Sequence, residues 1–203
     1  INQKLKETLV DSEEYLYKKL MATALGDEGI GLRKIGKYEE ALEVWERGLN
    51  VSIEINDSMG IAAGYNHFGI AYDIMGEPEK AIKYHKKSIA IKEKINDKAG
   101  LCTSFNNLGY IYNIQGLKTR AIQFYNKSLE MSISLGKESS EATALNNLAA
   151  IYGDYGNYEK ALEYYLRCLA IDERIGDPEY LATSLNNVAS KYRDLGEIEK
   201  SKE

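Results

Sequence analysis

The chain has 203 residues, of which 44% are hydrophobic and 28% are charged, and its formal net charge is −5. This composition is typical of a globular protein with enough apolar material for a core. No cluster of lysine and arginine stands clear of acidic neighbours, which argues against a nucleic-acid-binding surface. No apolar run approaches the roughly 20 residues that span a bilayer, so we expect no membrane insertion.

A repeating unit of 40 residues organises the chain. A longer motif returns with it: residues 106–112 read NNLGYIY, residues 146–152 read NNLAAIY, and residues 186–192 read NNVASKY. A fixed period in this range indicates one supersecondary unit that stacks on copies of itself. The interval is marked by a recurring glycine, at Gly36, Gly76, Gly116, Gly156 and Gly196.

Numbering the unit so that this glycine is position 15 divides the chain into repeats. Residues 1–21 are then the second-helix remnant of a preceding repeat and a connection, and residues 182–203 are a partial repeat. We expect a single array that is a segment of a longer one. The full repeats are 22–61, 62–101, 102–141 and 142–181.

Each unit predicts two helices. In the first helix, A, positions 4, 7, 8 and 11 are mostly apolar or small, which is the i, i+3, i+4, i+7 spacing of one helical face. The second helix, B, has a small residue at position 20. Pairs of Asn, Gly and Asp, such as Asn56-Asp57, predict the turns between repeats. Pro78 and Pro178 fall at a helix entrance and in a turn, where proline is tolerated. Position 24 of helix B is large: Trp45, His85, Tyr125 and Tyr165.

This pattern resembles the tetratricopeptide repeat. That family carries Leu-Gly-x-x-Tyr in its first helix, as at Leu108, Gly109 and Tyr112, and Ala-x-x-x-aromatic-x-x-small in its second. The resemblance covers residues 22–203 and is to the 40-residue variant found in LGN/Pins-type adaptors and in bacterial regulators. It implies an all-α fold, a right-handed α-solenoid of antiparallel helix pairs with about 4–5 repeats.

The first full copy departs from the pattern. Glu28 stands where later copies have Phe68, Leu108 and Leu148, and Asp27 stands where later copies have the recurring asparagine of position 6. An unpaired buried carboxylate is costly. We therefore expect either that this helix packs loosely or that the two carboxylates meet a basic group.

The outer face of helix A is the candidate binding surface. At about 100° per residue, positions 2, 6, 9 and 13 point away from the apolar stripe, and in the resembling family this face lines a concave groove. Secondary candidates are Thr103, Thr143 and Thr183 at position 2, and Asn66, Asn106, Asn146 and Asn186 at position 5. The resemblance assigns the groove to His67, Ile70, Asp73, Asn107, Tyr110, Asn113, Ile114, Asn147, Asp154, Asn187, Arg193 and Asp194.

The asparagines at position 6 have two interpretations. Asparagine is a mediocre helix former, so its recurrence within a helix needs a reason. Its amide can pair with the N–H and C=O groups of an extended peptide whatever the sequence of that peptide. Alternatively, these side chains bond between neighbouring helices and only support the solenoid. Position 5 lies at the edge facing neighbouring repeats and favours the structural role.

No catalytic, metal or cofactor site is expected. His67 replaces asparagine at position 6 and is expected to be another hydrogen-bonding group, while His85 takes an aromatic core slot. Cys102 and Cys168 match no metal spacing, and we expect both to be small buried residues in a reducing, cytoplasmic compartment. Residues 31–37 fit the spacing G-x-x-x-x-G-K, but Tyr38 replaces the Ser or Thr that would bind Mg²⁺.

The leading functional hypothesis is a scaffold module that binds an extended segment of a protein or peptide. The groove lacks the dense lysine and arginine set expected of a clamp for a C-terminal carboxylate. The alternative is a regulatory or sensory input module of a larger bacterial signalling protein, in which the repeats bind a signal peptide or form a homodimer through the ends of the array. An enzyme is not expected.

Overall fold

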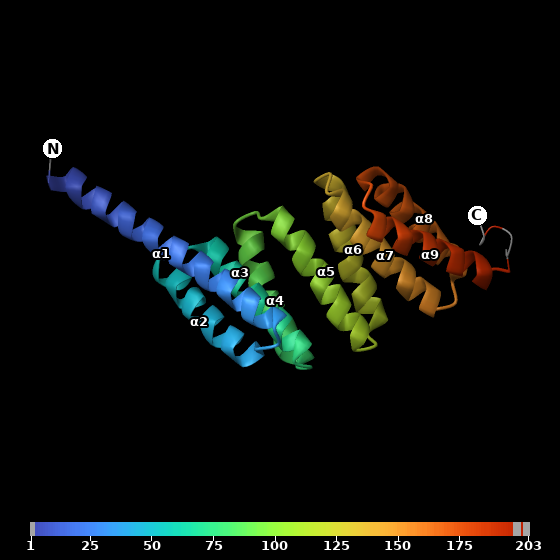
Figure 1. Cartoon of the computed structure of the whole chain (residues 1–203), viewed down its shortest axis with the longest axis horizontal. Coiled ribbons are helices and arrows are strands. Elements are labelled where there is room, and N and C mark those ends of the chain that lie inside the picture. Colours follow the sequence, from blue (N-terminus) through green and yellow to red (C-terminus); the bar gives the residue numbers. More distant parts are fainter. Residues whose placement is uncertain (1–2, 197–199, 201–203) are drawn as a thin grey trace. The chain divides into compact units, whose positions relative to one another are not determined.

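The computed structural model describes the backbone of residues 3–196 and residue 200, with side chains from residue 12 onward. Within these residues the chain forms helices and turns, and no strand is present, so the predicted all-α class is confirmed. The helices are α1 (Gln3–Lys34), α2 (Tyr38–Glu54), α3 (Ser58–Ile74), α4 (Pro78–Lys94), α5 (Lys98–Ile114), α6 (Lys118–Ser134), α7 (Glu138–Asp154), α8 (Tyr158–Ile175) and α9 (Pro178–Asp194), coloured along the chain in Figure 1.

The helices belong to two compact units, Ile1–Asp97 and Lys98–Glu203. In unit 1, α1 packs on α2, α2 on α3 and α3 on α4, and in unit 2 each of the helices α5 to α8 packs on the next. Within each unit short turns join these helices, so consecutive helices of one unit run antiparallel. The structure therefore contains the stacked helix pairs that the repeat predicts. None of the described helices combines the length and the hydropathy that a membrane span requires.

The turn between the A and B helices of each repeat contains a glycine in the left-handed backbone conformation. Gly36 has φ of 80°, a conformation that costs glycine little. Here the Lys37 N–H donates to the Leu32 carbonyl at 3.0 Å, which closes a Schellman motif at the end of α1. The same glycine follows each A helix, as the sequence predicted.

The turns between repeats use asparagine or glycine in the same conformation. Asn56 has φ of 54°, and the side chain of the following Asp57 caps α3 by accepting from the Met59 N–H at 3.1 Å. Pro78 is the first residue of α4, at the helix entrance that the sequence predicted. Pro178 was predicted to lie in a turn and is instead the first residue of α9, a position that also tolerates proline.

Helix α1 differs from the expectation. The sequence predicted a connection within residues 1–21, but Gln3–Lys34 is one uninterrupted helix. Leu16 and Tyr17 stand 40 residues before Asn56 and Asp57, and leucine does not readily take the left-handed conformation that the turn requires. Helix A of each repeat also begins earlier than the repeat numbering, with α3 starting at Ser58 rather than at residue 62.

Asp27 and Glu28, which depart from the repeat pattern, are both exposed. The buried face of this part of α1 is formed by Leu25 and Gly29 instead. No buried carboxylate arises there.

Close contact between A and B helices fixes the core of each repeat. A Cβ added at Gly109 would lie 2.6 Å from Cδ1 of Tyr125, and one added at Gly29 would lie 2.2 Å from Nε1 of Trp45. The absence of a side chain at these positions lets the ring approach the A-helix backbone. The small residue at position 20 of helix B is fully buried in every described repeat, at Ala41, Ala81, Ala121 and Ala161.

Candidate functional site

The A-helix face of unit 2 comprises positions 2, 6, 9, 12 and 13 of α5, α7 and α9. Asn107, Asn147 and Asn187 lie half-buried on these successive helices. Tyr110 and Ile114 of α5 are 48% and 61% exposed, which is high for large apolar side chains. Thr103, Thr143 and Thr183 are exposed on the same helices, as expected for position 2.

The asparagines of neighbouring repeats are hydrogen-bonded to one another. The Nδ2 group of Asn147 donates to Oδ1 of Asn106 at 2.9 Å, and that of Asn187 donates to Oδ1 of Asn146 at 2.9 Å. Position 6 therefore bonds back to position 5 of the preceding repeat. Each bond uses one of the two amide hydrogens of the donor, and its carbonyl oxygen is not consumed by it.

The acidic groups of this face have lysine partners that sequence reasoning missed. Lys118, at the start of α6, forms an ion pair with Asp154 at 2.9 Å, and Lys191 pairs with Asp194 on α9. The Lys191 pair is three residues apart on one helix and was readable from the sequence. The Lys118 pair joins the start of α6 to the end of α7, 36 residues further on, and can be recognised only from the fold. Arg193 is exposed beside Asp194.

Two further asparagines present buried acceptors. The Oδ1 atoms of Asn66 and Asn113 accept no hydrogen bond from the described residues. Asn66 belongs to α3 in unit 1 and Asn113 to the last turn of α5 in unit 2. A buried acceptor without a partner is costly, so these positions are ones where a hydrogen-bond donor would be favoured.

The A-helix face of unit 1 has a different chemistry. His67 stacks on Trp45 with ring centroids 5.0 Å apart, so this side chain contacts an aromatic ring. Burial lowers the pKa of His67, as do the charges of Arg33 and Lys92, while Asp27 acts in the opposite sense. Both rings border a cavity of about 220 Å³ between α1, α2 and α3.

The other predicted residues of this face are Ile70 and Asp73, which are half-buried on α3. Burial raises the pKa of the Asp73 carboxyl. Asn186, predicted as a secondary position, is exposed on α9, whereas Asn106 and Asn146 are half-buried.

The histidines and cysteines lie where the repeat predicts. His85 is 1% exposed, and burial, with a smaller effect of Lys92, lowers its pKa to about 4. Cys102 and Cys168 are free and buried. No group of three or more His, Cys, Asp or Glu side chains in the described part of the chain is placed to hold a metal ion.

Position 31 of helix B carries buried charges that sequence reasoning did not single out. Ser52 and Ser132 occupy this slot in two repeats, while Lys92 and Asp172 occupy it in the others, and all four are buried. The signal was available, because a slot that holds serine in two copies is too confined for a solvated charge. Asp172 borders a cavity of about 370 Å³ between α7, α8 and α9.

Comparison with protein families gives matches along most of the chain. One family model described as "Tetratricopeptide repeat" matches residues 20–94 and 140–203, and a second with the same description matches residues 103–132. No curated protein matches the sequence.

Solved structures give the same picture of the fold. BtubC (BKLC) from P. vanneervenii is similar with a TM-score of 0.85 and 21% identity, over 97% of this chain and 82% of that one. A Signal Transduction ATPase with Numerous Domains (STAND) protein with a tetratricopeptide repeat sensor, from Pyrococcus horikoshii, is similar with a TM-score of 0.79 and 24% identity, over 98% of this chain and 31% of that one. The apo form of RapI has a TM-score of 0.78 and 17% identity, over 96% of this chain and 55% of that one.

Proposed function

Because this chain belongs to the tetratricopeptide repeat family, we propose that it is a protein-interaction scaffold whose A-helix face holds an extended segment of a partner protein. The repeat fold supports the general role, since stacked helix pairs present an extended surface and carry no catalytic constellation of their own. The location of the binding face and the extended form of the partner are the specific parts of the proposal. It requires neither a cofactor nor catalysis.

The observation that carries the proposal is the fixed position of the amides in unit 2. The bonds from Asn147 to Asn106 and from Asn187 to Asn146 hold each side chain in one orientation before any partner arrives. A group that is already ordered loses little conformational entropy on binding. The two interpretations of the asparagines are therefore compatible: one amide can join two repeats and still offer a carbonyl oxygen and an N–H group to a peptide backbone.

The surroundings of these amides suit a partner with mixed chemistry. Tyr110 and Ile114 expose apolar surface next to Asn107 on α5, where an apolar side chain of the partner would be buried. Asp154 and Asp194 are neutralised by Lys118 and Lys191, so the centre of the face carries little net charge. The backbone of an extended segment, which is polar but uncharged, matches such a face.

A matched pair of substitutions tests the location. Asn107→Arg places a long charged side chain on the A-helix face, and Gln123→Arg makes the same change of charge at an exposed position of α6, away from that face. The native chain, immobilised and incubated with lysate of its source organism, is expected to capture a protein that the Asn107 variant loses and the Gln123 variant retains. Equal capture by both variants, with helical content unchanged by circular dichroism, would place binding elsewhere.

A second candidate function is a sensory or regulatory module within a larger signalling protein. The observation that favours it is the match to a STAND protein whose tetratricopeptide repeats are described as a sensor, of which this chain spans 31%. Self-association would then accompany signalling. Sedimentation of the chain over a range of concentrations tests this, because a dimer would support the regulatory candidate and a monomer at all concentrations would oppose it.

A further inference from the structure

The cavity between α7, α8 and α9 is lined both by exposed side chains such as Tyr180 and by the buried carboxylate of Asp172. Among the described residues that line it, two are carboxylates, Asp172 and Glu179, and none is lysine or arginine. Ile175 and the ring of Tyr180 supply apolar surface beside them. The cavity of about 370 Å³ therefore combines apolar surface with negative charge.

Asp172 is the buried end of this cavity, with 5% of its surface exposed. Its Oδ2 atom accepts from the hydroxyl of Ser184 at 2.5 Å. The thiol of Cys168 lies 3.5 Å from the same oxygen and 3.4 Å from the Ala142 carbonyl, and its single hydrogen can serve only one of them. An ionised carboxylate has about four acceptor positions, so these neighbours satisfy only part of its capacity.

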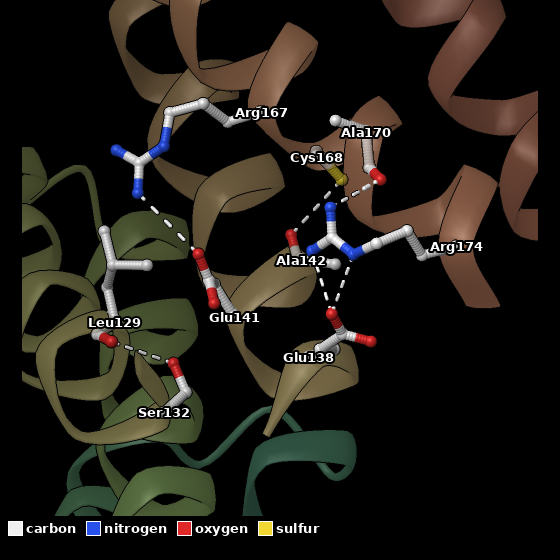
Figure 2. Close-up of polar contacts among 9 residues, drawn as sticks. All are labelled: Leu129, Ser132, Glu138, Glu141, Ala142, Arg167, Cys168, Ala170 and Arg174. Atoms are coloured by element: carbon white, nitrogen blue, oxygen red, sulfur yellow. Dashed lines mark hydrogen bonds and ion pairs between the residues drawn. The ribbon is translucent and has the colours of Figure 1, made fainter. Parts of the chain in front are cut away.

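The basic groups nearby on α8 are engaged by other carboxylates. Figure 2 shows the guanidinium of Arg174 between Glu138, with Nε donating at 2.9 Å, and the Ala170 carbonyl, which accepts from Nη1 at 2.9 Å. Arg167 in the same view points to Glu141 at 3.7 Å. The ion pairs of unit 2 formed by described residues thus do not include Asp172.

The equivalent place one repeat earlier serves as an internal comparison. There Ser132 occupies the slot of Asp172, and its hydroxyl donates to the Leu129 carbonyl at 2.9 Å, as Figure 2 also shows. The cavity at that place, between α5, α6 and α7, has a volume of about 120 Å³. In the first repeat Ser52 occupies the same slot and lines a cavity of about 220 Å³. The cavity beside the buried carboxylate is larger than both, so it has room for a ligand group.

We propose that this cavity takes a lysine side chain of the partner segment, with the ammonium group bound by Asp172 and the aliphatic stem lying against Ile175 and Tyr180. This inference rests on the proposed function, because it names a chemical feature of the segment held by unit 2. Thr143, which lines the cavity on α7, donates its hydroxyl hydrogen to the Ser139 carbonyl at 2.8 Å, so its oxygen remains able to accept a hydrogen bond.

Lysine fits this cavity better than arginine. A guanidinium binds a carboxylate best through two parallel bonds to both oxygens, and Oδ2 of Asp172 already accepts the short bond from the Ser184 hydroxyl. An ammonium group is a compact charge that can use the remaining oxygen and neighbouring acceptors with its three donors. Its long stem also tolerates apolar walls while the charged end reaches a polar site.

Two short peptides test the proposal directly. The probes are acetyl-Ala-Ala-Lys-Ala-Ala-amide and the same peptide with norleucine, which keeps the stem and lacks the ammonium group. Amide chemical shifts of the 203-residue chain, followed by NMR during titration, give both affinities and the site. The lysine peptide is expected to bind at least about tenfold more tightly than the norleucine peptide and to shift residues of the cavity wall.

Three variants test whether the carboxylate of Asp172 causes the preference for lysine. Asp172→Asn keeps the shape and removes the charge, and Asp172→Ser introduces the residue that two other repeats carry in this slot. Both are expected to abolish the preference for lysine. Glu173→Gln makes the same change of charge at the next, exposed position of α8 and is expected to keep the preference.

Equal affinity for both peptides, no binding of the lysine peptide, or an unchanged preference in both Asp172 variants would overturn the lysine site. These outcomes are distinct from failure of the proposed function. Peptides that bind equally on α5, α7 and α9 would leave the scaffold role intact. The capture experiment with the Asn107 and Gln123 variants tests that role without reference to Asp172.

Discussion

Two glycines in α1 allow the packing of helix A against helix B to be measured directly. Gly29 faces Trp45, and an added Cβ would lie 2.2 Å from its Nε1 atom. Gly31, two residues further on, has nothing within 4 Å of an added Cβ. Gly29→Ala and Gly31→Ala therefore make the same chemical change in the same helix, with and without a steric conflict.

The two substitutions are expected to change the free energy of unfolding in opposite directions. Alanine is favoured over glycine within a helix by about 1 kcal/mol, so Gly31→Ala should stabilise the chain by about that amount. Gly29→Ala has the same gain, but overpacking costs about 1–3 kcal/mol. The displaced indole also loses the hydrogen bond from Trp45 Nε1 to the Gly26 carbonyl, 3.0 Å long, which costs about 1–3 kcal/mol. The net expectation for Gly29→Ala is a loss of about 1–5 kcal/mol.

The assay is urea unfolding followed by tryptophan fluorescence. The chain has a single tryptophan, and it lies at the contact in question, so the signal reports on unit 1. The midpoint should rise for Gly31→Ala and fall for Gly29→Ala with similar slopes. If both variants were stabilised equally, the close A–B contact would not be what holds these helices together, and the reasoning would be refuted.

Three further predictions concern buried groups. Burial lowers the pKa of His85 from 6.5 to about 4, so the unfolded state binds the proton more readily and stability falls as pH drops through that interval. Pulse proteolysis should show this loss, and it should shrink in His85→Tyr. A double-mutant cycle with Asn106→Ala and Asn147→Ala should give a coupling free energy of about 0.5–1.5 kcal/mol in urea unfolding, and additive effects would mean that their bond contributes nothing. Cys102 and Cys168 should react with a thiol reagent at mildly alkaline pH only after unfolding, because both are buried and burial raises the pKa of Cys168 to about 11. Fast reaction in the native state would contradict their placement.

Most of the fold could be predicted because it repeats. Apolar spacing, the turn glycines and both prolines are local signals, and each recurs at a 40-residue interval, so an error in one copy is corrected by the others. The exception is α1, where Leu16 and Tyr17 replace the turn residues and no neighbouring copy informs the prediction. Because this copy has no turn residues and no preceding copy to compare with, its continuous helix could be recognised only from the structure.

The candidate site was less predictable, because it depends on contacts between repeats. The period places Asn106 and Asn147 on adjacent helices, but which amide donates to which follows from the geometry of packing. The pairing of Lys118 with Asp154 likewise joins residues 36 apart. Asp172 shows the opposite case. Comparing position 31 between repeats is enough to single out this carboxylate, and only the cavity beside it had to be found from the structure.

The central claim is that the A-helix face of unit 2 holds an extended partner segment, and photo-crosslinking tests it most directly. A benzoylphenylalanine at position 110 would replace the exposed Tyr110 on this face, and one at position 123 would replace the exposed Gln123 on α6. The account predicts that position 110 crosslinks to one continuous stretch of a single partner while position 123 does not. Crosslinking of the same partner from both positions, or from position 123 alone, would contradict it.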